Sequence, residues 1–191
     1  MIASVHLTGS DLIALCGLMA MMFIVVYVVT AYFKPQRYYK RLAKKQLRQL
    51  VEKRGVHEKI DLLHNCHPLA FEELVILIFH RCRNVKCRST GFTRDGGFDG
   101  FARITQDNKT LNVGIQSKRY QRGYINRKHL LQFSYVCKRR ELVPLFVYVG
   151  KISEENSKLA RRIGVEMFNE VSILHLIECR KLELGDKNGK K

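Results

Sequence analysis

The sequence predicts an α/β sandwich with a mixed central sheet, preceded by one helix that crosses a membrane. An uncharged apolar run stands near the N-terminus, and segments with helical and strand periods alternate after residue 57. The hydrophobic content of 46% is sufficient for a folded core. Thirty-four Lys and Arg against seventeen Asp and Glu give a formal net charge of +17, which indicates a polyanionic partner, either nucleic acid or an anionic membrane.

The apolar run covers residues 12–33 and contains no charged side chain. At about 1.5 Å per residue, a helix of this length crosses a hydrocarbon core of roughly 30 Å. A cleaved signal peptide is disfavoured, because no Lys or Arg precedes the run and no small-x-small cleavage pattern follows it. Positive charge follows the run, so we expect a single-pass inner-membrane protein with residues 1–11 outside and the C-terminus in the cytoplasm.

A basic juxtamembrane helix is expected over residues 34–56. It holds nine Lys or Arg and one acid, Glu52, and Gly55 is expected to end it. Its cationic face would bind anionic lipid headgroups, or DNA, or serve only as a solvated spacer, and the pattern does not separate these three readings.

The soluble domain is expected over residues 57–180, and each of its elements has a local signal. Pro68 and the following apolar spacing predict a helix, QDNK predicts the turn of a hairpin, and the nearly all-apolar VPLFVYV predicts a strand buried on both faces. Ser153 is expected to cap a helix, and a basic tail over residues 181–191 is expected to be disordered. The expected order is helix 68–82, strands 84–90, 98–105 and 111–119, helix 125–140, strand 143–149, helix 153–163 and a short strand 171–177.

Two common metal sites are disfavoured by spacing. The six cysteines include no C-x2-C pair and fit no common zinc finger, so we expect reduced and mostly buried thiols. The stretch RDGGFDG at residues 94–100 has calcium-loop features when Asp95 is taken as position 1. The required glutamate at position 12 is then replaced by Gln106, which excludes an EF-hand.

A different constellation surrounds the second aspartate of this stretch. Gln116 and Lys118 project to the same side of a predicted strand, and hairpin pairing brings Asp99 beside them. Glu72 can add a second carboxylate from the preceding helix. Carboxylate and amide oxygens next to a lysine suit Mg2+, with Mn2+ as the alternative, and the chemistry of phosphodiester hydrolysis.

Three motifs in order resemble a known family. FEELV at residues 71–75, RDGGFDG, and QSKRY at residues 116–120 are similar to the Mrr-like catalytic domain of restriction endonucleases, a branch of the PD-(D/E)xK nuclease superfamily. The resemblance covers roughly residues 65–178 and implies a restriction-endonuclease-like sandwich with an αβββαβ core. The sequence shows no separate DNA-recognition domain of the winged-helix type, so the resemblance does not indicate the target sequence.

The resemblance also implies roles for individual residues. Asp99 would bind the metal and Lys118 would be the catalytic lysine. Gln116 would replace the usual acidic ligand, and Glu72 would match the helix glutamate, with Glu73 as a substitute. Asp95 matches a recurrent family position, where it would shape the loop or support the metal indirectly.

A DNA-binding surface is expected independently of the resemblance. Residues 109–140 hold nine Lys or Arg and no acid, with tyrosines interleaved, and a solvated basic face is the alternative explanation. The residues expected to contact DNA are Arg119, Tyr120, Arg122, Arg127 and Lys128.

The sequence therefore favours a membrane-anchored, Mg2+-dependent DNA endonuclease that acts in restriction or defence against foreign or modified DNA. Double-strand cleavage would favour a homodimer. The alternative is a non-catalytic membrane tether that binds DNA through its basic surface.

Overall fold

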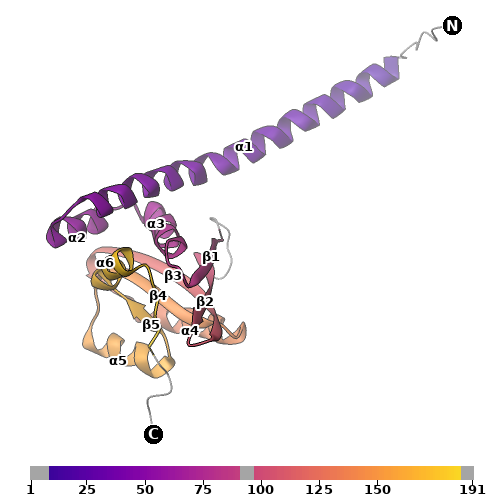
Figure 1. Ribbon diagram of the computed structural model, residues 1–191. Coiled ribbons are helices and arrows are strands. Elements are labelled where there is room, and N and C mark those ends of the chain that lie inside the picture. Colours follow the sequence, from indigo (N-terminus) through magenta and orange to yellow (C-terminus); the bar gives the residue numbers. More distant parts are fainter. Residues whose placement is uncertain (1–8, 91–96, 186–191) are drawn as a thin grey trace. The chain divides into compact units, whose positions relative to one another are not determined.

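A five-stranded mixed sheet forms the centre of the larger unit in the computed structural model of this chain (Figure 1). The structure describes residues 9–90 and 97–185. The chain divides into two units, residues 1–38 and residues 39–191, and the sheet lies wholly in the second. The strands, in their spatial order, are β1 (Val85–Ser89), β2 (Gly100–Gln106), β3 (Lys109–Tyr124), β4 (Val143–Lys151) and β5 (Glu166–Phe168).

The sheet combines an antiparallel half and a parallel half. β1, β2 and β3 pair antiparallel, whereas β3, β4 and β5 pair parallel. β2 and β3 form the expected hairpin, and the two turn residues, Asp107 and Asn108, have φ values of 49° and 58°. Asn and Asp tolerate this left-handed conformation, which matches the twist of a two-residue hairpin. The register Gly100↔Ile115 sets the residue before β2 level with Gln116.

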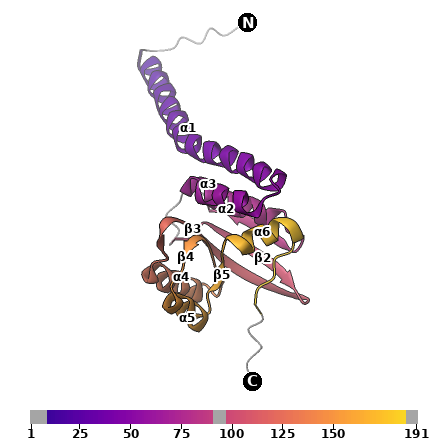
Figure 2. The ribbon, with the colours of Figure 1, turned by 90° about the vertical axis from the view of Figure 1, so that its left-hand side faces the viewer.

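Helices cover both faces of the sheet (Figures 1 and 2). One face carries α2 (Val56–His64), α3 (Pro68–His80) and α6 (Glu170–Cys179), and the other carries α4 (Arg127–Arg139) and α5 (Glu154–Ile163). Side chains of β4 alternate between two cores accordingly. Leu145 and Val147 join the first core, whereas Phe146 and Tyr148 join the second. The expected α/β sandwich with a mixed sheet is confirmed.

Side-chain caps explain where several helices begin. The Oγ atom of Ser153 accepts a hydrogen bond from the N–H of Asn156, as expected for α5. Asn126 caps α4 in the same way through Lys128. In α3 the cap is His67, followed by Pro68 in the first turn. These local bonds fix the entry points of the helices that flank the sheet.

The basic segment after the apolar run is part of the folded domain. α1 extends over Gly9–Glu52, and its residues 39–52 belong to the second unit. Ala43 and Leu50 are fully buried, and the Cys66 thiol donates a hydrogen bond to Gln46 Oε1 at 2.9 Å. This segment is therefore not a solvated spacer. Its boundary with the domain, expected at residues 56 and 57, lies earlier, because an apolar stripe runs between its cationic side chains.

The first unit contains one helical stretch that is long and apolar enough to cross a membrane. Ile13–Thr30, within α1, has a mean hydropathy of 2.5, and none of its residues is buried in the protein. Length and composition are the properties that identify it. A signal sequence near an N-terminus has the same properties, so the stretch is a candidate for a membrane span and for a signal sequence alike.

Two elements of the domain differ from expectation. Residues 171–177, expected as a strand, lie in the helix α6, where Asn169 caps the N-terminus by accepting from the Ser172 N–H. β-Branched residues in this segment suggested a strand, but the cap and the apolar spacing determine the helix. The final strand is instead β5, only three residues long. The short helix α2 was also not expected.

The start of the C-terminal tail is anchored rather than disordered. Leu182 and Leu184 are buried in the first core. The side-chain amide of Asn84 bonds both the N–H and the carbonyl of Leu182, and Gln106 does the same for Leu184. These two amides pair with the backbone much as a neighbouring strand would. Residues 186–191 lie outside the described residues.

Candidate active site

Asp99 is fixed by backbone bonds at the start of β2. Its N–H donates to Ile115 O at 2.9 Å, and its carbonyl accepts from Thr90 N at 3.1 Å, so β3 and β1 hold it from both sides. The carboxylate atom Oδ2 accepts a hydrogen bond from the Ser117 N–H. This arrangement places one carboxylate in a defined position beside β3 and largely removes it from water.

Gln116 has one satisfied and one unsatisfied amide atom. The side chain is 8% exposed, and its Nε2 donates to Gly97 O at 2.7 Å. Its Oε1 is buried and has no hydrogen-bond partner among the described residues. Such orphaned acceptors are uncommon in folded proteins, and a bound water or ion is one way to satisfy them. Gly97 has φ +88°, and a Cβ there would lie 2.9 Å from Gln116 Nε2, so both backbone angle and space require glycine.

The two glutamates of α3 differ in their surroundings. Glu73 is 4% exposed, and its Oε1 accepts a hydrogen bond from Ser89 Oγ at 3.2 Å. Glu72 is half-buried, and the charges of Asp99 and Lys118 act on its carboxyl group. The carboxylate of Glu73 is thus hydrogen-bonded to β1, whereas that of Glu72 lies near the other candidate residues. This favours Glu72 over Glu73 as the helix carboxylate.

Both carboxyl groups of the pair are held toward their neutral forms. The pKa of Glu72 is raised to about 7, first by burial and then by the charge of Asp99, while the charge of Lys118 opposes the shift. Burial raises the pKa of Asp99 to about 6, against the effects of Lys118 and of the Ser117 N–H. Two desolvated carboxylates near each other repel, so a cation between them would be stabilising.

The donor set fits a hard divalent cation. Asp99, Glu72 and the unpaired Oε1 of Gln116 supply only oxygen atoms, which Mg2+ and Mn2+ prefer. Among residues 9–90 and 97–185, no group of three or more His, Cys, Asp or Glu side chains is placed to hold a metal ion, so two carboxylates and the amide oxygen are the candidate ligands. The six cysteines, all among the described residues, form no disulfide. None of them belongs to a cluster of His, Cys, Asp or Glu that could hold a metal ion in the described part of the chain.

Two residues expected to contact DNA are bonded within the protein. Arg119 Nη1 donates to His64 O at 2.9 Å, and the buried Nε has no partner among the described residues. The Tyr120 hydroxyl bonds His129 Nδ1 at 2.9 Å, and the ring packs against the second core. These contacts brace β3 next to Lys118, and both side chains stay partly exposed, so their contact with DNA stays a prediction.

The remaining residues of the expected basic surface divide by location. Arg127 and Lys128 are exposed in the first turn of α4. The side chain of Arg122, like the whole of Asp95, lies outside the described part of the chain. The basic stretch 109–140 also exposes Lys109 and, at the end of α4, Lys138, Arg139 and Arg140.

Sequence reasoning missed two residues that shape the site. Gly97 holds the Gln116 amide, and Ser117 donates its N–H to Asp99. The positive φ of a glycine gives no distinct sequence signal beyond its presence in a turn. A backbone donor leaves no signal at all, because every residue except proline carries one.

The comparisons with known proteins give one family. A family model described as restriction endonuclease, the Mrr_cat model, matches residues 63–177 of this chain. The match covers α3 through most of α6 and includes Glu72, Asp99, Gln116 and Lys118. No curated protein and no solved structure matches the chain.

Proposed function

We propose that this chain, which belongs to the restriction endonuclease family of the Mrr catalytic-domain type, is a metal-dependent DNA endonuclease that acts in restriction or defence against foreign or modified DNA. The family supplies the nuclease activity and DNA as the substrate. The observation that carries metal dependence is the unpaired Oε1 of Gln116 beside two carboxyl groups with raised pKa values.

The oxygens of Asp99, Glu72 and Gln116 would hold the cation, Mg2+ or alternatively Mn2+. Such an ion lowers the pKa of a coordinated water and stabilises charge on phosphate oxygens. Asp99 is positioned for this role by the Ser117 N–H, and Gln116 by Gly97. Lys118, whose charge already acts on both carboxyl groups, would neutralise charge that develops on the phosphate or orient the attacking water.

A membrane anchor is part of the proposal. The exposed, uncharged Ile13–Thr30 stretch and the basic residues that follow it support a single-pass protein with its nuclease domain in the cytoplasm, at the inner membrane. Cutting both strands of a duplex needs two active sites, which a homodimer would supply. An anchored nuclease of this kind would meet DNA close to the membrane surface.

Cleavage by the full chain tests the activity. In detergent, with plasmid DNA and Mg2+ or Mn2+, the wild type should nick or linearise the DNA. Asp99→Asn and Lys118→Met should lower the rate at least about 100-fold, in line with the loss of a positioned charge in an active site. Modified and unmodified plasmids should both be tried, because the family alone does not fix the target.

Matched variants at the far end of the β2–β3 hairpin provide controls. Asp107→Asn and Lys109→Met make the same chemical changes at exposed residues and should retain full activity. If the wild type and all four variants shift DNA on a gel but leave every plasmid intact, the nuclease proposal is wrong. That result would favour the second candidate function, a non-catalytic membrane tether, which the net charge of +17 supports.

A further inference from the structure

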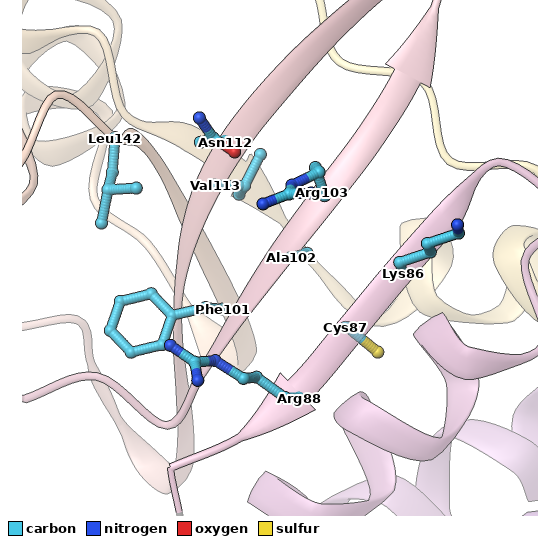
Figure 3. A pocket seen from close by; sticks show the side chains of 9 residues that line it. All are labelled: Lys86, Cys87, Arg88, Phe101, Ala102, Arg103, Asn112, Val113 and Leu142. Carbon is cyan, nitrogen blue, oxygen red and sulfur yellow. The ribbon is translucent and has the colours of Figure 1, made fainter.

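An open basic groove lies on the sheet face that α4 leaves uncovered (Figure 3). It has a volume of about 550 Å3. Its lining contains three cations, Lys86, Arg88 and Arg103, and no carboxylate. The remaining lining residues are Cys87, Phe101, Ala102, Asn112, Val113 and Leu142.

Strand register explains why the cations share one face. Lys86 pairs with Arg103, and Arg103 pairs with Asn112 on the next strand. Directly opposite residues of antiparallel strands project to the same side. The alternate residues face the first core; for example, the Cys87 thiol donates toward Ile76 O in α3. The polar side of β1 and β2 is thus a consequence of strand alternation in the sequence.

The cations of the groove lack anionic partners. All three are exposed, and among the residues that the structure describes none of them forms an ion pair. A row of uncompensated positive charges repels itself, and counterions or a polyanion relieve the repulsion. The groove is therefore complementary to a chain of negative charges that runs along the strands.

Aromatic rings join the groove to the active site. Arg88 lies over the ring of Phe101 at 5.4 Å, as Figure 3 shows, and Phe101 contacts Phe98 at a ring distance of 4.9 Å. Arg140 lies over the ring of Phe98 at 5.1 Å. Asp99 stands between these two phenylalanines in the sequence. The groove consequently begins next to the proposed metal ligand and extends away from it along β2.

The openness of the groove favours a polymer over a small molecule. Sites for small ligands are usually enclosed and have polar groups that converge on one point. Here the cations are spread along two strands, and β1 is the edge strand of the sheet. This spread of positive charge along the strands suits the evenly spaced phosphates of a nucleic acid backbone.

We propose that this groove binds the phosphodiester backbone of the DNA substrate at a distance from the phosphate that is cut. From Asp99 to Arg103 the strand advances about 13 Å at roughly 3.3 Å per residue. A DNA strand advances about 3.4 Å per nucleotide along its axis, so the contact falls about four nucleotides from the cut. The inference rests on the proposed function, because it takes DNA as the substrate.

Salt dependence of binding tests the groove separately from cleavage. The variant Lys86→Met/Arg88→Gln/Arg103→Gln is compared with the wild type for binding to a labelled duplex in EDTA, with the full chain in detergent. Each lost phosphate contact should reduce the slope of log K against log salt by about 0.9, or about 2.7 for three. Between 50 and 200 mM salt, the wild-type affinity should then fall about 40-fold more than that of the variant.

Two further variants control for net charge and for folding. Lys151→Met/Arg161→Gln/Arg162→Gln removes the same charges from exposed positions outside the groove and should keep the wild-type slope. Lys86→Arg/Arg103→Lys keeps the groove charge and should also keep it. Equal thermal unfolding midpoints for the wild type, the groove variant and the two controls would show that the groove variant is folded. If the groove variant has a lower midpoint, the single variant Arg103→Gln should still lower the slope by about 0.9.

The outcomes separate this inference from the proposed function. Equal slopes for the wild type and the groove variants, with normal cleavage by the wild type, would show that the groove does not bind DNA. The proposed nuclease function would stand. A slope difference without cleavage would overturn the nuclease activity and keep the groove as a DNA contact. If the groove variant instead lost binding only to vesicles containing anionic lipid, the face would be a membrane contact, and the inference would be wrong.

Discussion

At the scale of single residues, the site joins groups that are unfavourable in isolation. The Oε1 of Gln116 is buried without a partner, and burial raises the pKa values of Asp99 and Glu72. Each of these features costs folding free energy in the absence of a ligand. Such costs are tolerated at positions that bind a charged ligand, because the ligand reverses them.

The raised pKa values predict how stability depends on pH without divalent cations. A folded-state pKa above the unfolded value means that the folded protein binds protons more tightly, so the contribution is stabilising at low pH. For Asp99 it should be fully present below about pH 4 and lost as the pH rises through about 6; for Glu72 it should be lost through about 7. Asp99→Asn should therefore have a larger free energy of unfolding than the wild type at pH 8, by on the order of 3 kcal/mol, and a similar one near pH 4.

Thermal unfolding in EDTA across this pH range measures the effect, with Asp107→Asn as the exposed control. Adding Mg2+ at pH 8 should raise the midpoint of the wild type but not of Asp99→Asn, because the ion needs the ionised carboxylate. The Mg2+ effect should fade toward pH 5, as the carboxyl groups take up protons. A difference between wild type and Asp99→Asn that did not change with pH would contradict this account.

At the scale of elements, capping hydrogen bonds and strand pairing determine whether a short segment forms a helix or a strand when its apolar spacing fits both. The strands β2, β3 and β4 and the helices α3, α4 and α5 followed from apolar spacing, turn residues and caps. α6 did not, because a segment of ten residues with Val171 and Ile173 suits either structure until the Asn169 cap is considered. β5 is too short to carry a period, and only its pairing with β4 defines it.

The anchoring of residues 181–185 is another case in which distant residues determine local structure. A polar, charged C-terminus predicts disorder, but Asn84 and Gln106 provide backbone-like partners from nearly 100 and nearly 80 positions away. Sequence spacing cannot reveal such pairs. The same limit applies to the site, where proximity of Glu72 to Lys118 depends on packing of α3 against β3.

Removing one of these amides should release the segment. Gln106→Ala leaves the N–H and the carbonyl of Leu184 without partners and should lower the unfolding free energy by about 1–3 kcal/mol. Hydrogen exchange at residues 182–185 should accelerate, while exchange in β4 changes little. Gln132→Ala, at an exposed position of α4, is the matched control and should leave both measurements unchanged. Unaltered exchange in Gln106→Ala would show that burial of the leucines alone holds the segment.

At the scale of the whole molecule, the chain joins an apolar helical stretch to a basic nuclease domain. The sequence was sufficient to predict the α/β sandwich and the family, because three motifs and the order of elements carry both. It was not sufficient to predict that residues 39–52 pack on the domain. The cationic side chains of this segment dominate its composition, whereas Ala43, Gln46 and Leu50 make its contacts.

Membrane insertion of the first unit is the remaining prediction, and it separates a membrane span from a signal sequence. In a bacterial host, the full chain should remain in the membrane fraction after carbonate extraction, keep its N-terminal residues by mass spectrometry, and dissolve in detergent. Lysine at the centre of a membrane helix costs about 2.5–3.5 kcal/mol, so Leu18→Lys/Met22→Lys/Val25→Lys should release the protein into the soluble fraction. Val56→Lys/Leu131→Lys/Val171→Lys makes the same change at exposed apolar positions of the domain and should stay with the membrane.

Protease accessibility in the same bacterial host tests on which side of the membrane the domain lies. Protease added to spheroplasts should leave the nuclease domain intact if the basic residues that follow the apolar stretch remain in the cytoplasm, and should digest it after the cells are lysed. Digestion in intact spheroplasts would place the domain outside, and a shortened N-terminus would identify the apolar stretch as a signal sequence. Either result would remove the anchor from the proposed function while leaving the metal site and the basic groove to be judged by their own tests, because both lie within residues 39–191.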